Sequence, residues 1–129
     1  MKKSGILNRH LAGALAELGH TDLVLVCDAG MPVPPGPRVV DLAFRAGVPS
    51  FAEVLDGLLE ELVVEGAAAA QEVLDGNEAA AALLRERFPG LDLVPHEELK
   101  RLSRDARLVV RTGEASPYAN VLLRCGVFF

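Results

Sequence analysis

The stretch Leu23-Val24-Leu25-Val26-Cys27 is an unbroken apolar run of strand length. A strand with one face in water alternates apolar and polar residues, whereas a strand covered by helices on both faces is apolar throughout. The run therefore predicts a central strand that is buried on both faces. It stops at Asp28-Ala29-Gly30, and the proline-rich segment 31–37 that follows predicts an irregular loop, because proline has no backbone N–H to donate.

Strand and helix patterns alternate on both sides of this run. Apolar residues at helical spacing predict a first helix that ends at Gly19, and Ser50 with Glu53 forms a capping box at the start of a second helix. Further strands are expected at 38–43, 62–64, 108–110 and 119–125, and helices at 66–74, 77–88 and 97–102. The alternation predicts a single three-layer α/β/α domain over residues 1–129, with a largely parallel central sheet or, alternatively, a mixed one.

The composition limits the partners of this chain. Of its 129 residues, 50% are hydrophobic and 24% are charged, which excludes intrinsic disorder and leaves the surface short of polar cover. Subunit contacts are therefore expected, and the apolar end Val127-Phe128-Phe129 is expected to be packed. The net charge of −5 lacks the positive field that a nucleic acid requires. No stretch approaches the roughly 20 apolar residues of a membrane span, so we expect a soluble protein without a membrane partner.

Common metal and cofactor motifs are absent from the sequence. It contains neither C-x-x-C nor H-x-x-x-H, and neither of the glycine-rich phosphate loops G-x-G-x-x-G and G-x-x-x-x-G-K-[ST]. Cys27 and Cys125 lie in apolar stretches without paired spacing, as expected for reduced packing residues of a cytosolic protein. We therefore expect no metal and no cofactor.

Three polar residues beside predicted strands are candidates for a site. Asp28 directly follows the buried run, at the end of a strand where open α/β sheets bind ligands; it either binds a ligand or caps the loop. His20 lies between a helix and a strand and could exchange protons at neutral pH, although a lone loop histidine is more often a turn residue. His96 follows Pro95 and either takes part in a site or flanks a helix terminus.

A fourth candidate is the segment Glu114-Ala115-Ser116-Pro117-Tyr118-Ala119-Asn120, which contains the only tyrosine of the chain. The phenol of Tyr118 and the carboxamide of Asn120 are separated by one residue, so beside a strand they can project onto the same face. Together they offer a polyol a stacking edge, hydrogen-bond donors and an acceptor. The alternative is an ordinary turn followed by a strand.

Several ordered motifs together carry a family resemblance. They are Met1-Lys2-Lys3 with Gly5-Ile6-Leu7-Asn8, Leu18-Gly19-His20-Thr21-Asp22, Asp28-Ala29-Gly30-Met31-Pro32, Gly47-Val48-Pro49-Ser50-Phe51, and Arg111-Thr112-Gly113-Glu114 through Ser116-Pro117-Tyr118-Ala119-Asn120. In this order they resemble the ribose pyranase and fucose mutarotase family, and the second and third motifs look more like its ribose branch.

The resemblance implies a cofactor-free isomerase that interconverts β-D-ribopyranose and β-D-ribofuranose. It implies that His20 is the catalytic proton donor and that Asp28, His96 and Tyr118-Ala119-Asn120 bind the sugar. It also implies a cytoplasmic homodecamer of two stacked pentamers, with sites near subunit boundaries. Two alternatives stay open at this point: a mutarotase for another sugar such as fucose, and a non-catalytic sugar-binding or transport-accessory protein.

Overall fold

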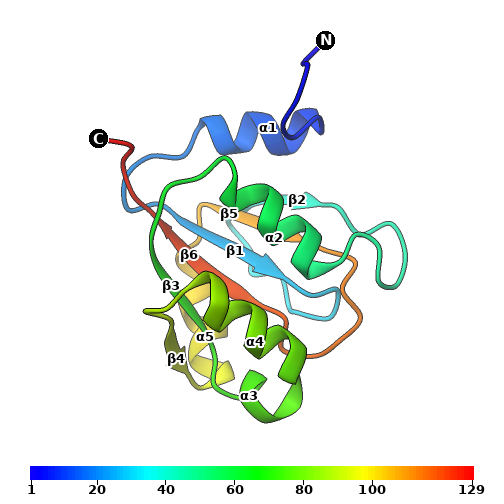
Figure 1. The fold of residues 1–129 in the computed structure, drawn as a ribbon, viewed down its shortest axis with the longest axis vertical. Coiled ribbons are helices and arrows are strands. Elements are labelled where there is room, and N and C mark those ends of the chain that lie inside the picture. Colours follow the sequence, from blue (N-terminus) through cyan, green and yellow to red (C-terminus); the bar gives the residue numbers. More distant parts are fainter.

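The computed structural model describes residues 1–129 (Figure 1). Its helices are α1 (Arg9–Ala16), α2 (Phe51–Leu59), α3 (Val73–Gly76), α4 (Glu78–Arg87), α5 (His96–Leu102) and the short 3-10 helix η1 (Ser103–Asp105). Its strands are β1 (Leu23–Cys27), β2 (Arg38–Asp41), β3 (Val64–Ala70), β4 (Asp92–Val94), β5 (Leu108–Arg111) and β6 (Val121–Cys125). No helix combines the length and the hydropathy required to span a bilayer.

The strands form one mixed sheet in the order β2-β5-β1-β6-β3-β4. Strand β5 is parallel to both β1 and β2, and β3 is parallel to β4. Strand β6 lies between β1 and β3 and is antiparallel to both, so it alone runs in the reverse direction. The predicted α/β fold with a largely parallel sheet is confirmed, in its mixed form.

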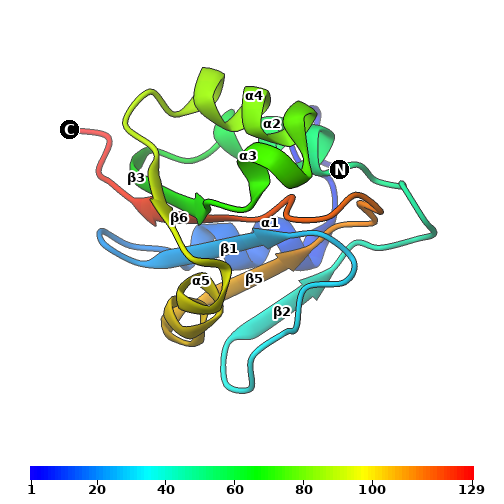
Figure 2. The same ribbon diagram turned by 90° about the horizontal axis from the view of Figure 1, so that it is seen from below.

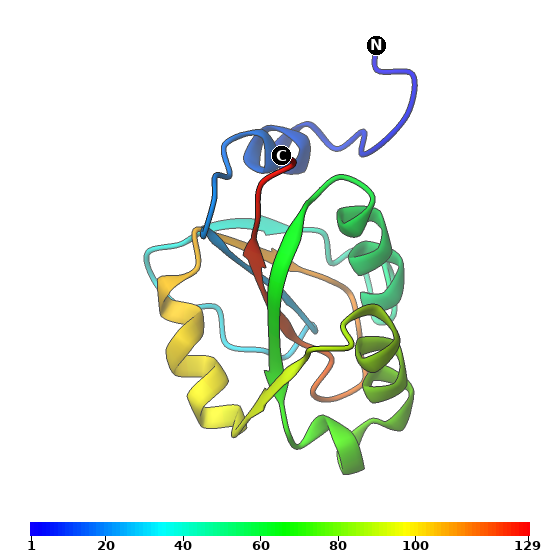
Figure 3. The same ribbon diagram turned by 60° about the vertical axis from the view of Figure 1, so that its left-hand side comes forward.

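Strand β1 is apolar at every position because both of its faces are buried. Val24 and Val26 point into a larger core shared with α1, α2 and α4, whereas Leu25 and Cys27 point into a smaller core shared with α5. Figures 2 and 3 show α2 and α4 on one side of the sheet and α5 on the other. The predicted burial of β1 on both faces is therefore confirmed, and it produces the three layers.

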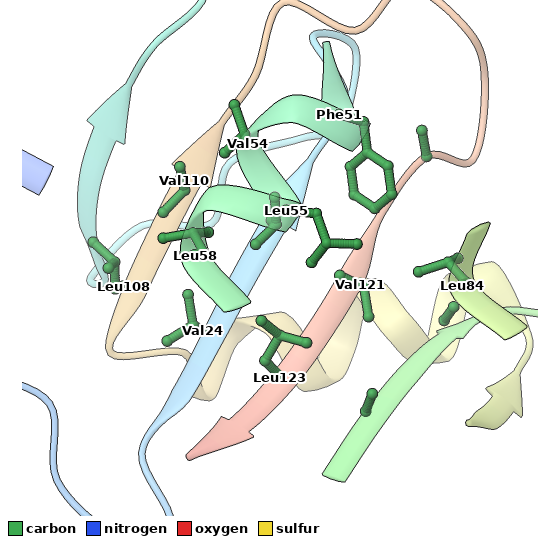
Figure 4. Close-up of a cluster of buried hydrophobic side chains, with 14 of the residues drawn as sticks. Val24, Phe51, Val54, Leu55, Leu58, Leu84, Leu108, Val110, Val121 and Leu123 are labelled. Atoms are coloured by element: carbon green, nitrogen blue, oxygen red, sulfur yellow. The ribbon is translucent and has the colours of Figure 1, made fainter. Parts of the chain in front are cut away.

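Helix α2 anchors the larger core. Ser50 Oγ accepts a hydrogen bond of 3.1 Å from the backbone N–H of Glu53, as the capping pattern predicts. Figure 4 shows the apolar face of α2 lying over β1, β5 and β6; its buried residues are Phe51, Val54, Leu55 and Leu58. Since complete burial of each such side chain contributes roughly 1.5–3 kcal/mol, α2 is held by packing more than by helix propensity.

The helix expected over 66–74 is wrong. Residues 66–70 of that segment belong to β3, and the helix α3 is a single turn. The strand expected over 62–64 shares only Val64 with β3. Alanine favours helices in isolation, but β3 is hydrogen-bonded to β6 on one side and β4 on the other. Ala69 packs in the larger core and Ala70 in the smaller, so small side chains let helices approach both faces.

Several predicted boundaries move by a few residues. The first helix ends at Ala16 rather than at Gly19, and the strand expected over 38–43 ends at Asp41. The last strand begins at Val121, because residues 119 and 120 still belong to the preceding loop.

The last two residues are not packed within the single chain, so contacts inside the chain do not supply the packing predicted for this end. Phe128 and Phe129 are 89% and 91% exposed, and their rings contact one another edge to face at a centroid distance of 5.2 Å. Figure 3 shows this end of the chain beside α1. The structure therefore leaves two aromatic side chains uncovered at one edge of the sheet.

Candidate functional site

A cavity of about 380 Å³ opens at the carboxyl edge, the edge of the sheet where the five parallel strands end. Asp28 follows β1, His96 follows β4, and Asn120 precedes the reversed strand β6, so three elements deliver polar side chains to one place. The full lining is Asp28, Gly30, Met31, Pro32, His96, Lys100, Pro117, Tyr118 and Asn120. The structure thus brings together Asp28, His96, Tyr118 and Asn120, which the sequence separates.

Asp28 and Asn120 form the floor of this cavity. Asn120 Oδ1 accepts a hydrogen bond of 2.8 Å from the backbone N–H of Asp28, and Asp28 Oδ1 accepts one of 3.0 Å from Gly30. The two side chains are nearly buried, with exposed fractions of 7% and 1%. Asp28 therefore caps the loop with one oxygen, while its Oδ2 and the Nδ2 of Asn120 remain available to a ligand.

His96 and Tyr118 form one wall. Their rings meet edge to face at a centroid distance of 5.2 Å and an angle of 85°. The backbone N–H of His96 donates to Glu72 Oε2 at 2.8 Å, which fixes the start of α5. His96 Nδ1 is buried without a hydrogen-bond partner, and buried polar atoms of this kind are rare. A ligand hydroxyl in the cavity would satisfy it.

The backbone at Tyr118 is held in an unusual conformation. Its φ of 58° lies in the left-handed region, which non-glycine residues rarely occupy outside turns and functional sites. Asn77 Nδ2 donates to Ser116 Oγ and to the carbonyl of Pro117, both at 2.8 Å. A Cβ at Gly76 would lie 2.8 Å from the ring of Tyr118, so the absent side chain makes room for that ring. The turn between α3 and α4 therefore shapes this wall.

Glu114 ties the same loop to α2. Its Oε1 accepts from the backbone N–H of Phe51 at 3.0 Å, and its Oε2 accepts from Ser116 Oγ at 2.9 Å. Burial raises the pKa of Glu114, but the hydrogen bonds from Phe51 and Ser116 outweigh that effect and hold the pKa below its ordinary value. The loop that carries Tyr118 therefore favours the charged form of Glu114.

Lys100, Gly76 and Asn77 were not among the sequence-based candidates, whereas Glu114 belongs to the candidate segment 114–120. Lys100 could have been found, because it lies four residues after His96 and hence on the same face of a helix. Gly76 and Asn77 act through contacts between segments distant in the sequence, which no local pattern reveals.

The two cysteines take no part in the cavity chemistry. Both are free and buried, which confirms their interpretation as packing residues. Cys27 lies next to Asp28 in the chain, and burial raises the pKa of its thiol to about 12. The thiol therefore stays protonated and is a poor nucleophile. No group of three His, Cys, Asp or Glu side chains could hold a metal ion together.

His20 lies at the opposite, amino edge of the sheet, just before β1. Its side chain is 53% exposed and borders a hollow of about 340 Å³ whose lining includes Leu18, Val63 and Phe128. The five residues of β1 span roughly 16 Å at about 3.3 Å per residue, so His20 does not reach the cavity of its own chain. Ala119 is also apart from the cavity, because its side chain is buried in the larger core and leaves only backbone groups to a ligand.

The family model described as the RbsD / FucU transport protein family matches residues 1–128. The chain belongs to this family. It is 81% identical to the D-ribose pyranase of Streptomyces avermitilis over 129 residues, and 66% identical to D-ribose pyranase 1 of Rubrobacter xylanophilus over the same length. Both matches cover 100% of each chain. The resemblance predicted from the ordered motifs is confirmed.

Solved structures of family members have the same fold. The structure of Bacillus subtilis RbsD complexed with D-ribose matches with a TM-score of 0.95 and 46% sequence identity, covering 100% of both chains. The fucose mutarotase of Streptococcus pneumoniae in complex with L-fucose matches with a TM-score of 0.78 and 22% identity, covering 95% of both chains. The second likeness establishes the shared fold alone.

Proposed function

We propose that this protein is a D-ribose pyranase, an isomerase that interconverts β-D-ribopyranose and β-D-ribofuranose. The observation that carries the proposal is the full-length identity of 81% to a D-ribose pyranase. A structure with 46% identity contains D-ribose, whereas the fucose mutarotase has 22% identity, so ribose is favoured over fucose. The family match to residues 1–128 supports a single sugar pyranase domain over residues 1–129.

The chemistry requires only proton transfers. When the pyranose opens, the bond between C1 and the ring oxygen breaks, that oxygen gains a proton, and the anomeric hydroxyl loses one as the aldehyde forms. When the furanose closes, the C4 hydroxyl attacks C1, loses its proton, and the aldehyde oxygen gains one. No electrons are gained or lost, so the reaction needs neither a redox cofactor nor an external reactant.

The cavity at the carboxyl edge holds the sugar in this proposal. Asp28 Oδ2 accepts from a sugar hydroxyl, Asn120 Nδ2 donates to one, and His96 Nδ1 finds the partner that it lacks within the chain. Tyr118 supplies a ring edge and a hydroxyl, and Ala119 contributes its backbone. Binding the open chain in a fixed orientation favours reclosure through a different hydroxyl.

His20 donates the proton in this proposal, and it must come from a neighbouring copy. Within one chain the whole of β1, roughly 16 Å long, lies between His20 and Asp28, far more than the hydrogen-bond distance that proton transfer needs. The exposed rings of Phe128 and Phe129 lie at the same edge as His20 and offer an apolar contact to another copy. We infer that copies join carboxyl edge to amino edge, in a cytoplasmic homodecamer of two pentamers.

Saturation-transfer NMR on ribose and fucose, in the presence of a chelator, tests the activity. We expect faster exchange between the pyranose and furanose signals of ribose. Accelerated exchange of fucose alone would replace ribose by another sugar. Binding of ribose, measured by calorimetry, without accelerated exchange would support the sugar-binding or transport-accessory alternative.

Mixing two impaired variants, at a ribose concentration well below saturation of the wild type, tests the shared site. His20→Ala leaves the cavity intact and Asp28→Asn leaves His20 intact, so a site is complete where the cavity of a His20→Ala chain meets the amino edge of an Asp28→Asn chain. After unfolding and refolding a 1:1 mixture, about one quarter of the wild-type activity should return, because random pairing completes one contact in four. Absence of recovery in assembled mixtures would contradict a site built from two copies. Light scattering establishes the assembly, which deletion of residues 127–129 should disrupt.

A further inference from the structure

At the amino edge, outside the sugar cavity, three charged or titratable residues contact one another in series. His20 Nε2 lies 3.0 Å from Glu65 Oε2, and Glu65 Oε1 lies 3.3 Å from Arg124 Nε. They come from the turn before β1, from β3 and from the end of β6. Glu65 therefore bridges the histidine to a cation, with a different oxygen for each.

The surrounding backbone holds this arrangement in place. The turn that carries His20 is closed by a hydrogen bond of 2.8 Å from the backbone N–H of Gly19 to Asp22 Oδ2. It is joined to β6 by the backbone N–H of Thr21, which donates to the carbonyl of Cys125 at 2.9 Å. A Cβ at Gly126 would lie 3.3 Å from the Cβ of Glu65, so this glycine leaves the space that the Glu65 side chain occupies.

The contact determines which nitrogen of His20 is free. A carboxylate only accepts hydrogen bonds, and the Glu65 carboxylate also forms an ion pair with Arg124. At 3.0 Å, Nε2 is therefore the nitrogen that carries a proton, and its N–H donates to Glu65. Nδ1 makes no hydrogen bond within the chain, so it is the nitrogen that is free to exchange protons with another molecule.

We propose that Glu65 is a positioning residue that orients His20 so that Nδ1, and not Nε2, exchanges the proton with the sugar. This inference rests on the proposed function of His20. Protonated Nδ1 gives its proton to the departing ring oxygen, and the resulting lone pair on Nδ1 accepts a proton from a sugar hydroxyl. The proton on Nε2 stays in the bond to Glu65 throughout, so His20 returns to its starting state after each cycle. Arg124 holds the Glu65 carboxylate in the orientation that presents Oε2 to Nε2 of the His20 imidazole.

Substitutions at Glu65 test the positioning role. Glu65→Ala should lower the exchange rate at saturating ribose about 10- to 100-fold, the scale of loss for a misplaced catalytic group, with unchanged ribose affinity. Glu65→Gln keeps an oxygen that can accept from Nε2, so its loss should be smaller. Glu61→Gln is the matched control, because Glu61 lines the same hollow without a hydrogen bond to His20, and it should leave the rate unchanged. Light scattering confirms that each variant assembles.

The protonated nitrogen can be observed directly in the unmodified protein. The chain has three histidines, so selective 15N labelling of histidine gives three pairs of ring nitrogens, and the His20 pair is assigned by its absence in His20→Ala. With the imidazole neutral, His20 should carry its proton on Nε2. In Glu65→Ala the difference between its two nitrogen shifts should shrink, as the other tautomer becomes populated.

The outcomes separate this inference from the proposed function. A His20 that carries its proton mainly on Nδ1 in the wild type overturns the assignment of the reactive nitrogen. Full exchange activity in an assembled Glu65→Ala, beside a loss in His20→Ala, overturns the positioning role alone. Normal exchange in His20→Ala overturns the catalytic role of His20, and absence of ribose exchange in the wild type overturns the proposed function.

Discussion

The two edges of the sheet differ in how complete they are. At the carboxyl edge, Asp28 and Asn120 are nearly buried, bonded to one another, and enclosed by His96 and Tyr118 within a single chain. At the amino edge, the side chain of His20 is 53% exposed beside an apolar hollow and an uncovered C-terminal end. A site built before assembly must satisfy its own buried polar groups, whereas a surface that awaits a second copy can leave its groups open. We interpret the first as the binding half and the second as the catalytic half.

The sharpest test of this division is His20→Ala. If the amino edge supplies the proton and the carboxyl edge supplies affinity, exchange should fall about 10²- to 10⁴-fold, the effect of removing a general acid or base. Ribose affinity, measured by calorimetry, should be retained. Near-normal exchange in assembled protein would instead assign proton transfer to the carboxyl edge, at His96 or Tyr118.

Asp28→Asn should give the complementary result. The substitution replaces an acceptor oxygen by a donor and removes a charge from contacts worth roughly 1.5–3 kcal/mol, so ribose affinity should fall roughly 10- to 150-fold. Asp92→Asn is the control, because Asp92 is exposed on β4 and outside the cavity. Equal affinities in the two variants would remove Asp28 from the binding half.

Gly76→Ala examines how the binding half is supported. The new Cβ would lie 2.8 Å from the Tyr118 ring, and relieving such overlap costs about 1–3 kcal/mol, so Tyr118 should move and affinity should fall on the order of 10-fold. Gly57→Ala in α2 has open space around it and should leave affinity unchanged. Calorimetry measures both, and wild-type affinity in Gly76→Ala would show that the ring position is not needed.

The smallest expected effect concerns acid stability of the loop that carries Tyr118. Hydrogen bonds lower the pKa of Glu114 in the folded chain below the ordinary value of 4.5. The stabilisation is therefore complete above about pH 4.5 and is lost as the pH falls through the lower, folded value. Glu114→Gln should flatten the fall in unfolding free energy between about pH 5 and pH 3, measured with urea. An undiminished fall would place the acid sensitivity elsewhere, and Glu53→Gln serves as the exposed control.

The sequence predicted the centre of the sheet far better than its margin. Strand β1 was located to the residue, because a run buried on both faces has a simple signature and Asp28 ends it. Strand β3 was missed, because a run of alanines favours a helix in isolation and only pairing with β6 and β4 makes it a strand.

The same contrast holds for the site. The rule that ligands bind beyond the carboxyl ends of strands was sufficient to single out Asp28, and Tyr118 and Asn120, which the sequence also singled out, both line the cavity. The contact between His20 and Glu65 joins residues 45 positions apart, so no local spacing could reveal it. The predicted strand 23–27 did place His20 before it and Asp28 after it, and the structure confirms that they lie at its opposite ends.

The length of β1 has a consequence for how the protein would behave on dilution. Because the five-residue strand β1 separates His20 from the cavity, a lone chain would lack the proposed proton donor at its cavity, and under the proposed function each complete site would be a product of association. Activity per milligram should then be constant at high protein concentration. Below the concentration at which copies separate, it should fall, and ribose that contacts both copies should restore it by mass action.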